Sequence, residues 1–439
     1  MSMTKSKNIL KLVFLTIIFQ ITQASDTISE KQIERFATAI TQVSHYYIKP
    51  VSYEDLFNAA IRGMLTSLDP HSDYLSPKDI KELQASTTGE YAGIGIEIIP
   101  ENGLIKVISP MRETPAAKAG IQAGDMIIKV DDKLIRDVST DEAIRMIKGP
   151  AGSVVTITVI RENSSDSLVF KIKREIIALK SVQAKMYRDK ILYASIDSFG
   201  DKTSQQLQNQ IERIGKTKNI GGLIIDLRNN PGGTLTAAIE TADLFLDRNS
   251  TMFNGLIVYT RGRLDIDNME AYATPGDILQ KKPIVVLINN GSASASEIVA
   301  GALRDQKRAV VMGTQSFGKG SVQTVIPIDY ESAIKLTTSL YYTPNGTSIQ
   351  ANGIIPDVFA PYTKMPKQEQ RNNIEKVFEE LNESNLSGHL TANSNLNQDN
   401  TSKILARKEE QAKLAYDDFQ LYQALNLVDA MIVRGLLNN

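Results

Sequence analysis

A serine and a lysine 25 residues apart carry the clearest chemical signal in this sequence. Ser294 lies in a small-residue turn, Asn289 to Ser296, between an apolar run at 284–288 that predicts a buried strand and a helical pattern at 297–304. A serine at such a turn lies beside unpaired backbone N–H groups and the positive end of a helix dipole. This position suits a nucleophile whose reaction creates an oxyanion. Serine is also a common helix cap, so the turn alone leaves both interpretations open.

A serine nucleophile needs a base, and the three histidines are poorly placed for that role. His45 falls in the first predicted helix, His71 in a turn where we expect structural contacts, and His389 in a stretch rich in Asn and Ser. Lysine can replace histidine when burial disfavours its ammonium form and lowers its pKa. We therefore favour a lysine over a histidine as the general base.

Lys319 is the candidate base, although a lysine between two glycines is more often part of a surface turn. Gln323 follows four residues later, and its amide oxygen could orient the long, flexible amine. We hypothesise a Ser294–Lys319 dyad oriented by Gln323. The oxyanion would bind the backbone N–H groups of Ala295 and of Gly233, which lies in a Gly-Gly turn after another predicted strand.

The elements around these turns predict an alternating α/β region. Apolar runs predict buried strands, and helical patterns separate them. We expect strands at 191–196, 222–226, 284–288 and 310–312, and helices at 203–214 and 235–245, with 335–342 and Val358 completing the sheet region.

Composition narrows the possible classes of function. The 439 residues suffice for two or three domains, and 42% hydrophobic and 23% charged residues are ordinary for globular protein. The formal net charge of -1 gives no reason to expect a nucleic-acid partner. The chain has no cysteine, which excludes disulfides and thiolate chemistry, and its three histidines argue against a metal cluster. We expect neither a cofactor nor a metal.

The amino terminus has the features of a secretory signal peptide. Lys5, Lys7 and Lys11 precede or enter an apolar core at 12–19, and small residues follow at Thr22 and Ala24. This pattern predicts cleavage after Ala24 and a mature chain in the periplasm or another extracytoplasmic space. A membrane-anchored form stays open if the signal is not cleaved.

Helices are expected near both ends of the mature chain. An apolar stripe runs from Ile33 to Val43, and a second helix follows Ser52, whose hydroxyl could cap it. Residues 382–402 read as a flexible linker. A last helix from about Lys403 carries Leu421, Leu425, Val428 and Ile432 on one face. We expect it to dock on a partner or another subunit, and the terminal helices to form a homo-oligomer.

Residues 88–172 have the pattern of a small unit of strands and short helices. A glycine-containing turn at 91–95 leads into an alternating strand, and its backbone N–H groups could hold a carboxylate. Further strands are expected at 104–108, 125–130, 154–160 and 168–172. Helices are expected at 115–119 and after the capping box that starts at Ser139.

Three segments of this unit resemble a PDZ domain of the bacterial protease type: YAGIGIEI, PAAKAGIQAGDMIIKVDD and EAIRMIKGPAGSVVTITVIRE. The resemblance implies recognition of a peptide C-terminus. The peptide would add as a strand beside Ile94 to Ile98, with its carboxylate on the turn. The implied binding residues are Gly93, Ile94, Gly95 and Ile96.

Five further segments resemble the C-terminal processing peptidases, also called tail-specific serine proteases: GSASASEIVAGALRD, TQSFGKGSVQT, DLRNNPGGTL, IQANGIIPDV and AIRGMLTSLDPHSDYL. The resemblance covers about residues 30–360. It implies a serine endopeptidase with a crotonase-like core, and it gives the nucleophile, base and orienting roles to Ser294, Lys319 and Gln323. Asp305 also matches a motif position, where a helix-end contact and a catalytic role both stay open.

The sequence therefore predicts an α+β multidomain protein with a helical N-terminal region, a PDZ domain, a crotonase-like α/β serine protease core and a C-terminal helix. The expected boundaries are 1–24 for the signal peptide, 25–87 for the helical region, 88–175 for the PDZ domain, 176–362 for the core, 363–402 for the linker and 403–439 for the last helix.

The expected partners are proteins with accessible C-terminal tails, and an adaptor protein is a further possibility. The expected reaction is cleavage through an acyl-enzyme, in the processing or degradation of cell-envelope proteins. Binding of a tail to the PDZ domain should bring the loops near Lys319 into a competent arrangement. Three rival classes are a β-lactamase-like enzyme that uses Ser316-Phe317-Gly318-Lys319, a binding module with an inactive core, and a scaffold protein.

Overall fold

The computed structural model describes residues 28–363 and 410–437, except 112, 163, 165 and 179. The expected signal peptide, almost all of the expected linker and His389 lie outside the described residues. The chain divides into two units, residues 1–68 and 69–439.

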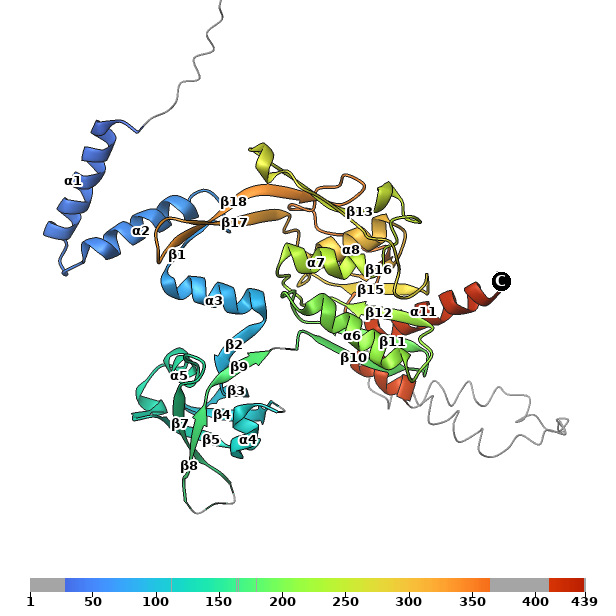
Figure 1. Ribbon diagram of the computed structural model, residues 1–439, viewed down its shortest axis with the longest axis horizontal. Coiled ribbons are helices and arrows are strands. Elements are labelled where there is room, and N and C mark those ends of the chain that lie inside the picture. Colours follow the sequence, from blue (N-terminus) through green and yellow to red (C-terminus); the bar gives the residue numbers. More distant parts are fainter. Residues whose placement is uncertain are drawn as a thin grey trace, which may run out of the picture. The chain divides into compact units, whose positions relative to one another are not determined.

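The first unit contains two amphipathic helices, blue in Figure 1, as the sequence predicts. They are α1 (Glu30–Tyr46) and α2 (Tyr53–Thr66). The hydroxyl of Ser52 accepts a hydrogen bond from the backbone N–H of Asp55, so it caps α2 as expected. The rings of Phe36 and Phe57 pack edge to face between the helices, with their centroids 6.0 Å apart.

The second unit begins with short elements that the periodic patterns did not predict. They are β1 (Asp73–Leu75), α3 (Pro77–Thr88) and β2 (Glu90–Gly93), which pairs with β9 (Glu175–Ala178). Ser76 and Asp79 form a capping box at the start of α3. The backbone N–H of Asp201 donates to the carbonyl of Thr87, which joins the end of α3 to the core.

A small antiparallel sheet with its own apolar core follows. Its strand order is β3-β4-β5-β7-β8, so β3 is an edge strand. Leu168–Lys173 pairs with Val154–Ile160, as predicted. The strand expected at 94–98 starts only at Ile96, because Gly95 has a left-handed φ of +77° and Ile94 is buried in the core. The bounds are β3 Ile96–Glu101, β4 Leu104–Pro110, α4 Pro115–Ala119, β5 Met126–Val130, β6 Lys133–Leu134, the 3₁₀ turn η1 Ile135–Asp137, α5 Thr140–Ile147, β7 Val154–Ile160 and β8 Leu168–Lys173.

The core is built on a second, mostly parallel sheet with the order β10-β11-β12-β15-β16-β19. Only β10 runs antiparallel to its neighbour. The bounds are β10 Val182–Tyr187, β11 Ile191–Ile196, α6 Thr203–Gly215, β12 Gly222–Asp226, α7 Leu235–Asp243, β15 Ile284–Ile288, α8 Ala295–Asp305, β16 Val310–Gly313 and β19 Val358–Phe359.

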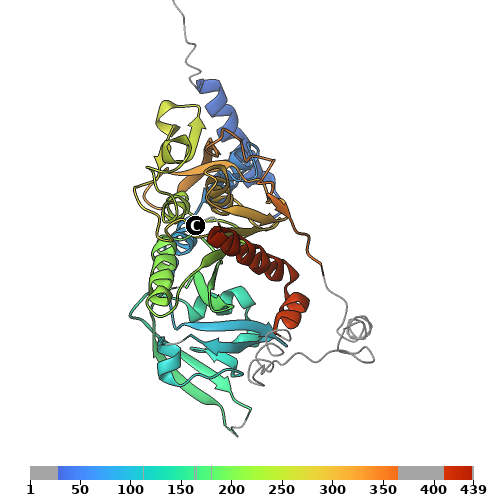
Figure 2. The ribbon, with the colours of Figure 1, turned by 90° about the vertical axis from the view of Figure 1, so that its right-hand side faces the viewer.

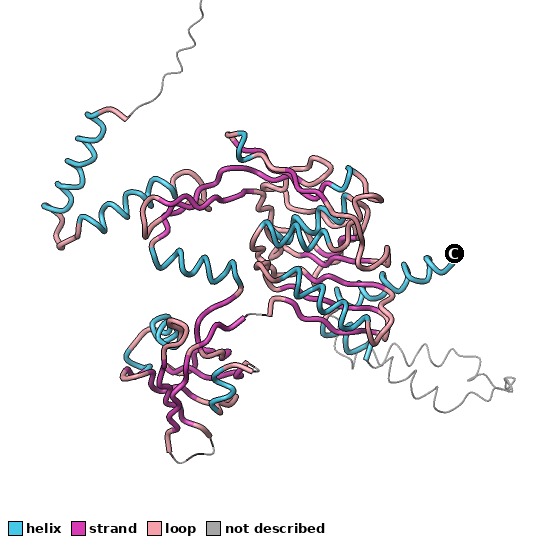
Figure 3. The backbone as a smooth tube through the Cα atoms, in the orientation of Figure 1, coloured by secondary structure: helices cyan, strands magenta, loops and turns pink. Residues whose placement is uncertain are grey.

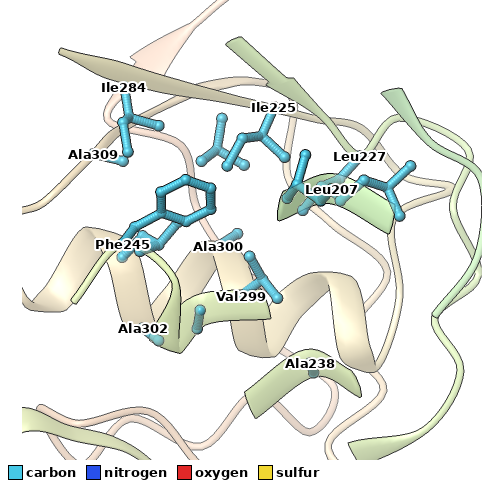
Figure 4. Packing of buried hydrophobic residues seen from close by; sticks show 14 of the residues in the cluster. Leu207, Ile225, Leu227, Ala238, Phe245, Ile284, Val299, Ala300, Ala302 and Ala309 are labelled. Carbon is cyan, nitrogen blue, oxygen red and sulfur yellow. The ribbon is translucent and has the colours of Figure 1, made fainter. Parts of the chain in front are cut away.

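Alternating residues of the central strands fill two different apolar layers, because successive side chains of a strand point to opposite faces. Leu223 and Ile225 of β12 pack with α6, α7 and α8, in the cluster drawn in Figure 4. Ile224, between them, packs with residues of the C-terminal helix on the other face. Both faces of the sheet are therefore covered, which explains why these strands read as continuous apolar runs.

The C-terminal helix docks on its own chain, which makes the prediction of a partner surface for its apolar face wrong. Residues 410–417 are helical, and α11 (Phe419–Leu437) follows, red in Figures 1 and 2. Leu421, Leu425 and Val428 are buried against the central sheet. At the start of α11, the Asp418 carboxylate binds the Arg228 guanidinium at 2.7 and 2.9 Å.

A third sheet carries residues that complete the site. The β17–β18 ribbon is its longest part, drawn as paired strands in Figure 3. The bounds are the 3₁₀ turn η2 Phe253–Gly255, β13 Leu256–Gly262, the 3₁₀ turn η3 Asp265–Asp267, β14 Glu270–Tyr272, β17 Ser321–Pro327 and β18 Ala333–Tyr342. The order is β1-β18-β13-β14, with β17 on β18. No helix among the described residues has the length and apolarity to cross a bilayer.

Candidate active site

The Ser294 turn and the Gly-Gly turn meet at one edge of the central sheet. The strands β12 and β15 are parallel neighbours, and each turn follows the carboxyl end of one of them. This edge is where open parallel sheets commonly place their functional loops. The backbone N–H of Ala293 donates to the carbonyl of Asn230 at 3.0 Å, which ties the two turns together.

Ser294 occupies a strained backbone position at the start of α8. Its φ of +53° and ψ of -113° are rare for a residue with a side chain, and such strain costs on the order of 1–3 kcal/mol. The neighbouring serines have structural roles. The hydroxyl of Ser292 donates to the carbonyl of Leu227 at 2.7 Å, and that of Ser296 to Asn230 at 3.0 Å. The three serines of the turn are thus distinguished by their contacts.

The two backbone N–H groups expected to bind an oxyanion are available. Neither the Gly233 N–H nor the Ala295 N–H has an acceptor among the described residues. Gly232 packs so closely that an added Cβ would lie 2.8 Å from the Cβ of Ser294 and 3.0 Å from the nitrogen of Ala295. The loop after β12 and the start of α8 therefore form one compact arrangement that only glycine permits.

Glu297 joins the serine turn to the lysine loop. Its side chain is fully buried and accepts four hydrogen bonds. One oxygen accepts the backbone N–H groups of Ser294 at 2.7 Å and Lys319 at 2.9 Å, and the other accepts the Ser316 hydroxyl at 2.6 Å and the Gly318 N–H at 2.7 Å. Burial raises the pKa of Glu297, while these hydrogen bonds oppose the rise. The backbones of Ser294 and Lys319 are thus held next to each other.

Lys319 has the environment that a neutral amine needs. Burial, and then the positive charge of Lys335, lower the pKa of Lys319 below its ordinary value, while Glu297 acts in the opposite direction. Its amine forms no hydrogen bond or ion pair with any described residue, including Ser294.

Tyr341 lies between the two candidate catalytic residues. Its buried hydroxyl donates to the carbonyl of Lys319 and is also hydrogen-bonded to the Ser294 side chain. Burial raises the pKa of Tyr341, so its hydroxyl keeps its proton. In this arrangement the Ser294 hydroxyl is engaged by Tyr341.

Gln323 is held by hydroxyl groups on two strands. Its amide nitrogen donates to Ser321 Oγ at 2.9 Å and to Thr337 Oγ1 at 3.2 Å. Thr337 Oγ1 in turn donates to Asp69 Oδ1 at 3.1 Å. The Asp69-Pro70-His71-Ser72 segment thereby joins the site.

His71 makes the expected turn contact, because its backbone N–H donates to Asp69 at 2.7 Å. Its imidazole also lies near the lysine. Burial, and then the charge of Lys319, lower the pKa of His71, while Asp69 acts in the opposite direction.

The structure separates two other candidates from the chemistry. Asp305 pairs with Arg304 at 3.1 Å and accepts the Asn345 N–H at 3.2 Å, as a helix-end contact would. Ser316 donates to Glu297 and accepts the Ile354 N–H at 2.6 Å. The 316–319 segment is not helical, so the β-lactamase-like interpretation of its Ser-x-x-Lys spacing is wrong.

The expected carboxylate turn lies at the start of the edge strand β3. The N–H groups of Ile94 and Gly95 have no acceptor among the described residues, and Gly93 ends β2. The Thr114 hydroxyl donates to the carbonyl of Gly95 at 3.0 Å. The described residues contain no group of three His, Asp or Glu side chains that could hold a metal ion.

Sequence reasoning missed Glu297, Tyr341, Thr337 and Asp69. Glu297 follows Ser294 by three residues, the spacing of a capping box, so that signal was available. The other three lie far from Ser294 and Lys319 in sequence, and only the pairing of β18 with β1 and β17 brings them to the site.

Comparisons with known protein families identify the class of protein to which this fold and this site belong. Residues 190–360 match Peptidase family S41, 106–161 match a PDZ domain, and 16–79 match the Activating protease CtpB N-terminal domain. The chain is thus a serine peptidase that contains a PDZ domain.

The relatives give the family. A Carboxy-terminal-processing protease of Bartonella bacilliformis is 43% identical over 94% of this chain and 92% of its own. A "Probable CtpA-like serine protease" of Staphylococcus haemolyticus is 35% identical over 74% of this chain and 64% of its own. The structure of the photosystem II D1 C-terminal processing protease is 27% identical, with a TM-score of 0.44, over 78% of this chain and 96% of that one. The chain belongs to the carboxy-terminal-processing protease family.

Proposed function

We propose that this peptidase cleaves peptide bonds with Ser294 as nucleophile and neutral Lys319 as base, through an acyl-enzyme. The observation that carries the proposal is the Glu297 carboxylate, which binds the backbone N–H groups of both residues through one oxygen. A half-buried lysine that has no ion-pair partner among the described residues, next to a strained serine turn, is an arrangement suited to this chemistry.

In the first step, Ser294 Oγ bonds to the scissile carbonyl carbon and its proton passes to the Lys319 amine. The resulting oxyanion accepts hydrogen bonds from the N–H groups of Gly233 and Ala295. When the carbon–nitrogen bond breaks, the lysine proton goes to the leaving amine. Water then hydrolyses the ester, again with Lys319 as base. Gln323 orients the amine in both halves of the reaction.

The Ser294 hydroxyl must leave Tyr341 before it can donate its proton to Lys319. In the proposed scheme, the contact between Tyr341 and Ser294 belongs to the enzyme before substrate binds. A rotation about χ1 of Ser294 releases it, which is a small change that substrate binding could favour.

We infer that the PDZ domain captures the C-terminal tail of a substrate. A tail would add as a strand along Ile96 and the following residues of β3, which have a free edge. Its carboxylate would accept hydrogen bonds from the turn at Gly93, Ile94 and Gly95. Export by the predicted signal peptide would give the enzyme cell-envelope proteins as substrates. Assembly into a homo-oligomer through α1 and α2, and the use of an adaptor, belong to the same proposal.

The test compares the wild type with Ser294→Ala and Lys319→Ala on a protein that ends in an apolar, unstructured tail. Both variants should lose at least about 1000-fold in kcat/KM, because the nucleophile or its base is missing. Gel filtration and circular dichroism check that both fold. Full activity of Lys319→Ala would refute the dyad. A wild-type protein that binds tails but does not cleave them would favour a binding module.

A further inference from the structure

Gln323 is connected to a carboxylate that the catalytic scheme does not use. Asp69 accepts the Thr337 hydroxyl at 3.1 Å, and Thr337 Oγ1 accepts the Gln323 amide nitrogen at 3.2 Å. Asp69 comes from the segment before β1, whereas Thr337 and Gln323 face each other across β18 and β17. The chain of contacts runs from the segment before β1 to the residue that we propose orients the base.

The order of donors and acceptors along this chain has one solution. Hydrogen bonds lower the pKa of Asp69 against the effect of burial, so its carboxylate is ionised and can only accept. A hydroxyl has a single proton, and that of Thr337 goes to Asp69. Thr337 must therefore accept from Gln323, and only the amide nitrogen can donate.

The second hydrogen of the same nitrogen goes to Ser321 Oγ at 2.9 Å. Both donors of Gln323 are then used, and its amide oxygen has no partner among the described residues. An amide in the flipped orientation would place its oxygen opposite Thr337 Oγ1, whose only proton is donated to Asp69, and would turn its N–H groups toward a base that must stay free to accept a proton.

We propose that Asp69 acts through Thr337 as a positioning residue, fixing the Gln323 amide so that its oxygen is the atom offered to the Lys319 amine. The inference rests on the proposed dyad and extends it to a relay of four residues, Asp69–Thr337–Gln323–Lys319. The Asp-Pro-His-Ser segment thus contributes to activation of the base as well as to its own turn.

The Asp329 turn makes the same local hydrogen bonds as the Asp69 turn. Comparing variants of the two turns distinguishes a loss of turn structure from a loss of Gln323 positioning. Asp69 accepts the N–H groups of His71 and Ser72 and the Ser72 hydroxyl, and Asp329 accepts the N–H groups of Glu331 and Ser332 and the Ser332 hydroxyl. Among the hydrogen bonds and ion pairs of the described residues, none joins Asp329 to Asp69, Thr337, Gln323 or Lys319. Asp329→Ala is therefore the matched control for Asp69→Ala.

Thr337 offers a second pair of variants on one strand. Thr337→Val keeps the shape and the Asp69 turn but removes the relay hydroxyl, and Thr337→Ser restores it. Thr338→Val is the control, because the Thr338 hydroxyl is hydrogen-bonded to the Thr324 hydroxyl at 2.8 Å and to no other described residue.

The readout is the labelling rate of the full-length protein by a fluorophosphonate. In that reaction Ser294 Oγ bonds to phosphorus, fluoride leaves, and the hydroxyl proton passes to Lys319, so no tail needs to bind. Thr337→Val and Asp69→Ala should each label about 10- to 100-fold more slowly, since small displacements in a catalytic site have costs of this order. Thr337→Ser, Thr338→Val and Asp329→Ala should stay within about threefold of wild type.

A double-mutant cycle decides whether the effect passes through Gln323. If it does, Thr337→Val with Gln323→Ala should label no more slowly than Gln323→Ala alone. Additive losses, or wild-type labelling of Thr337→Val, would overturn the relay. A refutation of the Ser294–Lys319 dyad can be told apart from a refutation of the relay, because Lys319→Ala would then be labelled at the wild-type rate.

Discussion

At the scale of single residues, the property that matters most is the protonation of Lys319. Burial and the neighbouring Lys335 both disfavour the ammonium form, and Glu297 partly offsets them. The group has a pKa below its ordinary value, so it becomes an effective base at a lower pH than a free lysine would. Activity should rise with pH as Lys319 loses its proton.

Replacing Lys335 should therefore move the pH profile. In Lys335→Gln, removal of a positive charge makes the ammonium form of Lys319 easier to keep, and its pKa rises. The rise of kcat/KM should shift to higher pH by about one unit or less. Lys171→Gln changes an exposed lysine of β8 and should leave the profile unchanged. A shift to lower pH in Lys335→Gln would contradict this account of the base.

Some of these residues could be predicted from sequence and some could not. Ser294 and Lys319 were accessible because the chain lacks a well-placed histidine and because a strand-turn-helix pattern surrounds the serine. Tyr341 and Thr337 were not, since each follows from strand pairing between distant segments. Both read as ordinary members of a half-buried strand.

At the scale of elements, the central sheet depends on the C-terminal helix. One face of β12 and β15 would be exposed without α11, because Ile224, Val285 and Leu287 pack against it. Arg228, which leads into the Gly-Gly turn, is bound by Asp418 at the start of α11. Hydrogen bonds from Arg228 lower the pKa of Asp418 against the effect of burial, so this docking contributes stability above the ordinary aspartate pKa that is lost as the pH falls below it.

Truncation of the helix face should measure this dependence. Leu425 is fully buried and Val433 is 50% exposed on the same helix. Leu425→Ala should lower the free energy of unfolding by about 2–5 kcal/mol, because it removes buried methyl groups and leaves a cavity. Val433→Ala should change it by about 0.5 kcal/mol or less. Equal small effects in urea titrations would mean that α11 is not an integral part of the core.

The apolar runs predicted the buried strands with the correct bounds at 191–196, 222–226 and 284–288. They missed β10, β13 and β17, which are not continuously buried; in β17 only the first residue, Ser321, is buried. Periodicity predicted the apolar face of α11, but it does not reveal which surface covers that face. In the structure, the central sheet of the same chain covers it.

At the scale of the whole molecule, a tail-binding domain and a peptidase core occur in one chain. The PDZ sheet is connected to the core through β2, β9 and the contact between Thr87 and Asp201. These connections are a physical route by which an occupied groove could bias the loops around Lys319. The expected crotonase-like character of the core and the domain boundaries stay predictions.

Capping the substrate carboxylate should reveal this control. A tail that ends in an amide loses the charge that the Ile94 and Gly95 N–H groups would bind, so its kcat/KM should fall about 10-fold or more relative to the free acid. In a variant that lacks residues 88–175, the two substrates should be cleaved at equal rates. Unchanged preference for the free acid in that variant would place tail recognition outside the PDZ domain.

The central claim is that Ser294 becomes acylated when Lys319 accepts its proton. The most direct measurement is rapid acid quenching of the enzyme during turnover of a tail-bearing ester or peptide, followed by peptide mapping with mass spectrometry. We predict a substrate acyl group on Ser294 in the wild type and none in Lys319→Ala. An adduct on another residue, such as Ser316, or equal acylation of Ser294 without Lys319, would contradict the account.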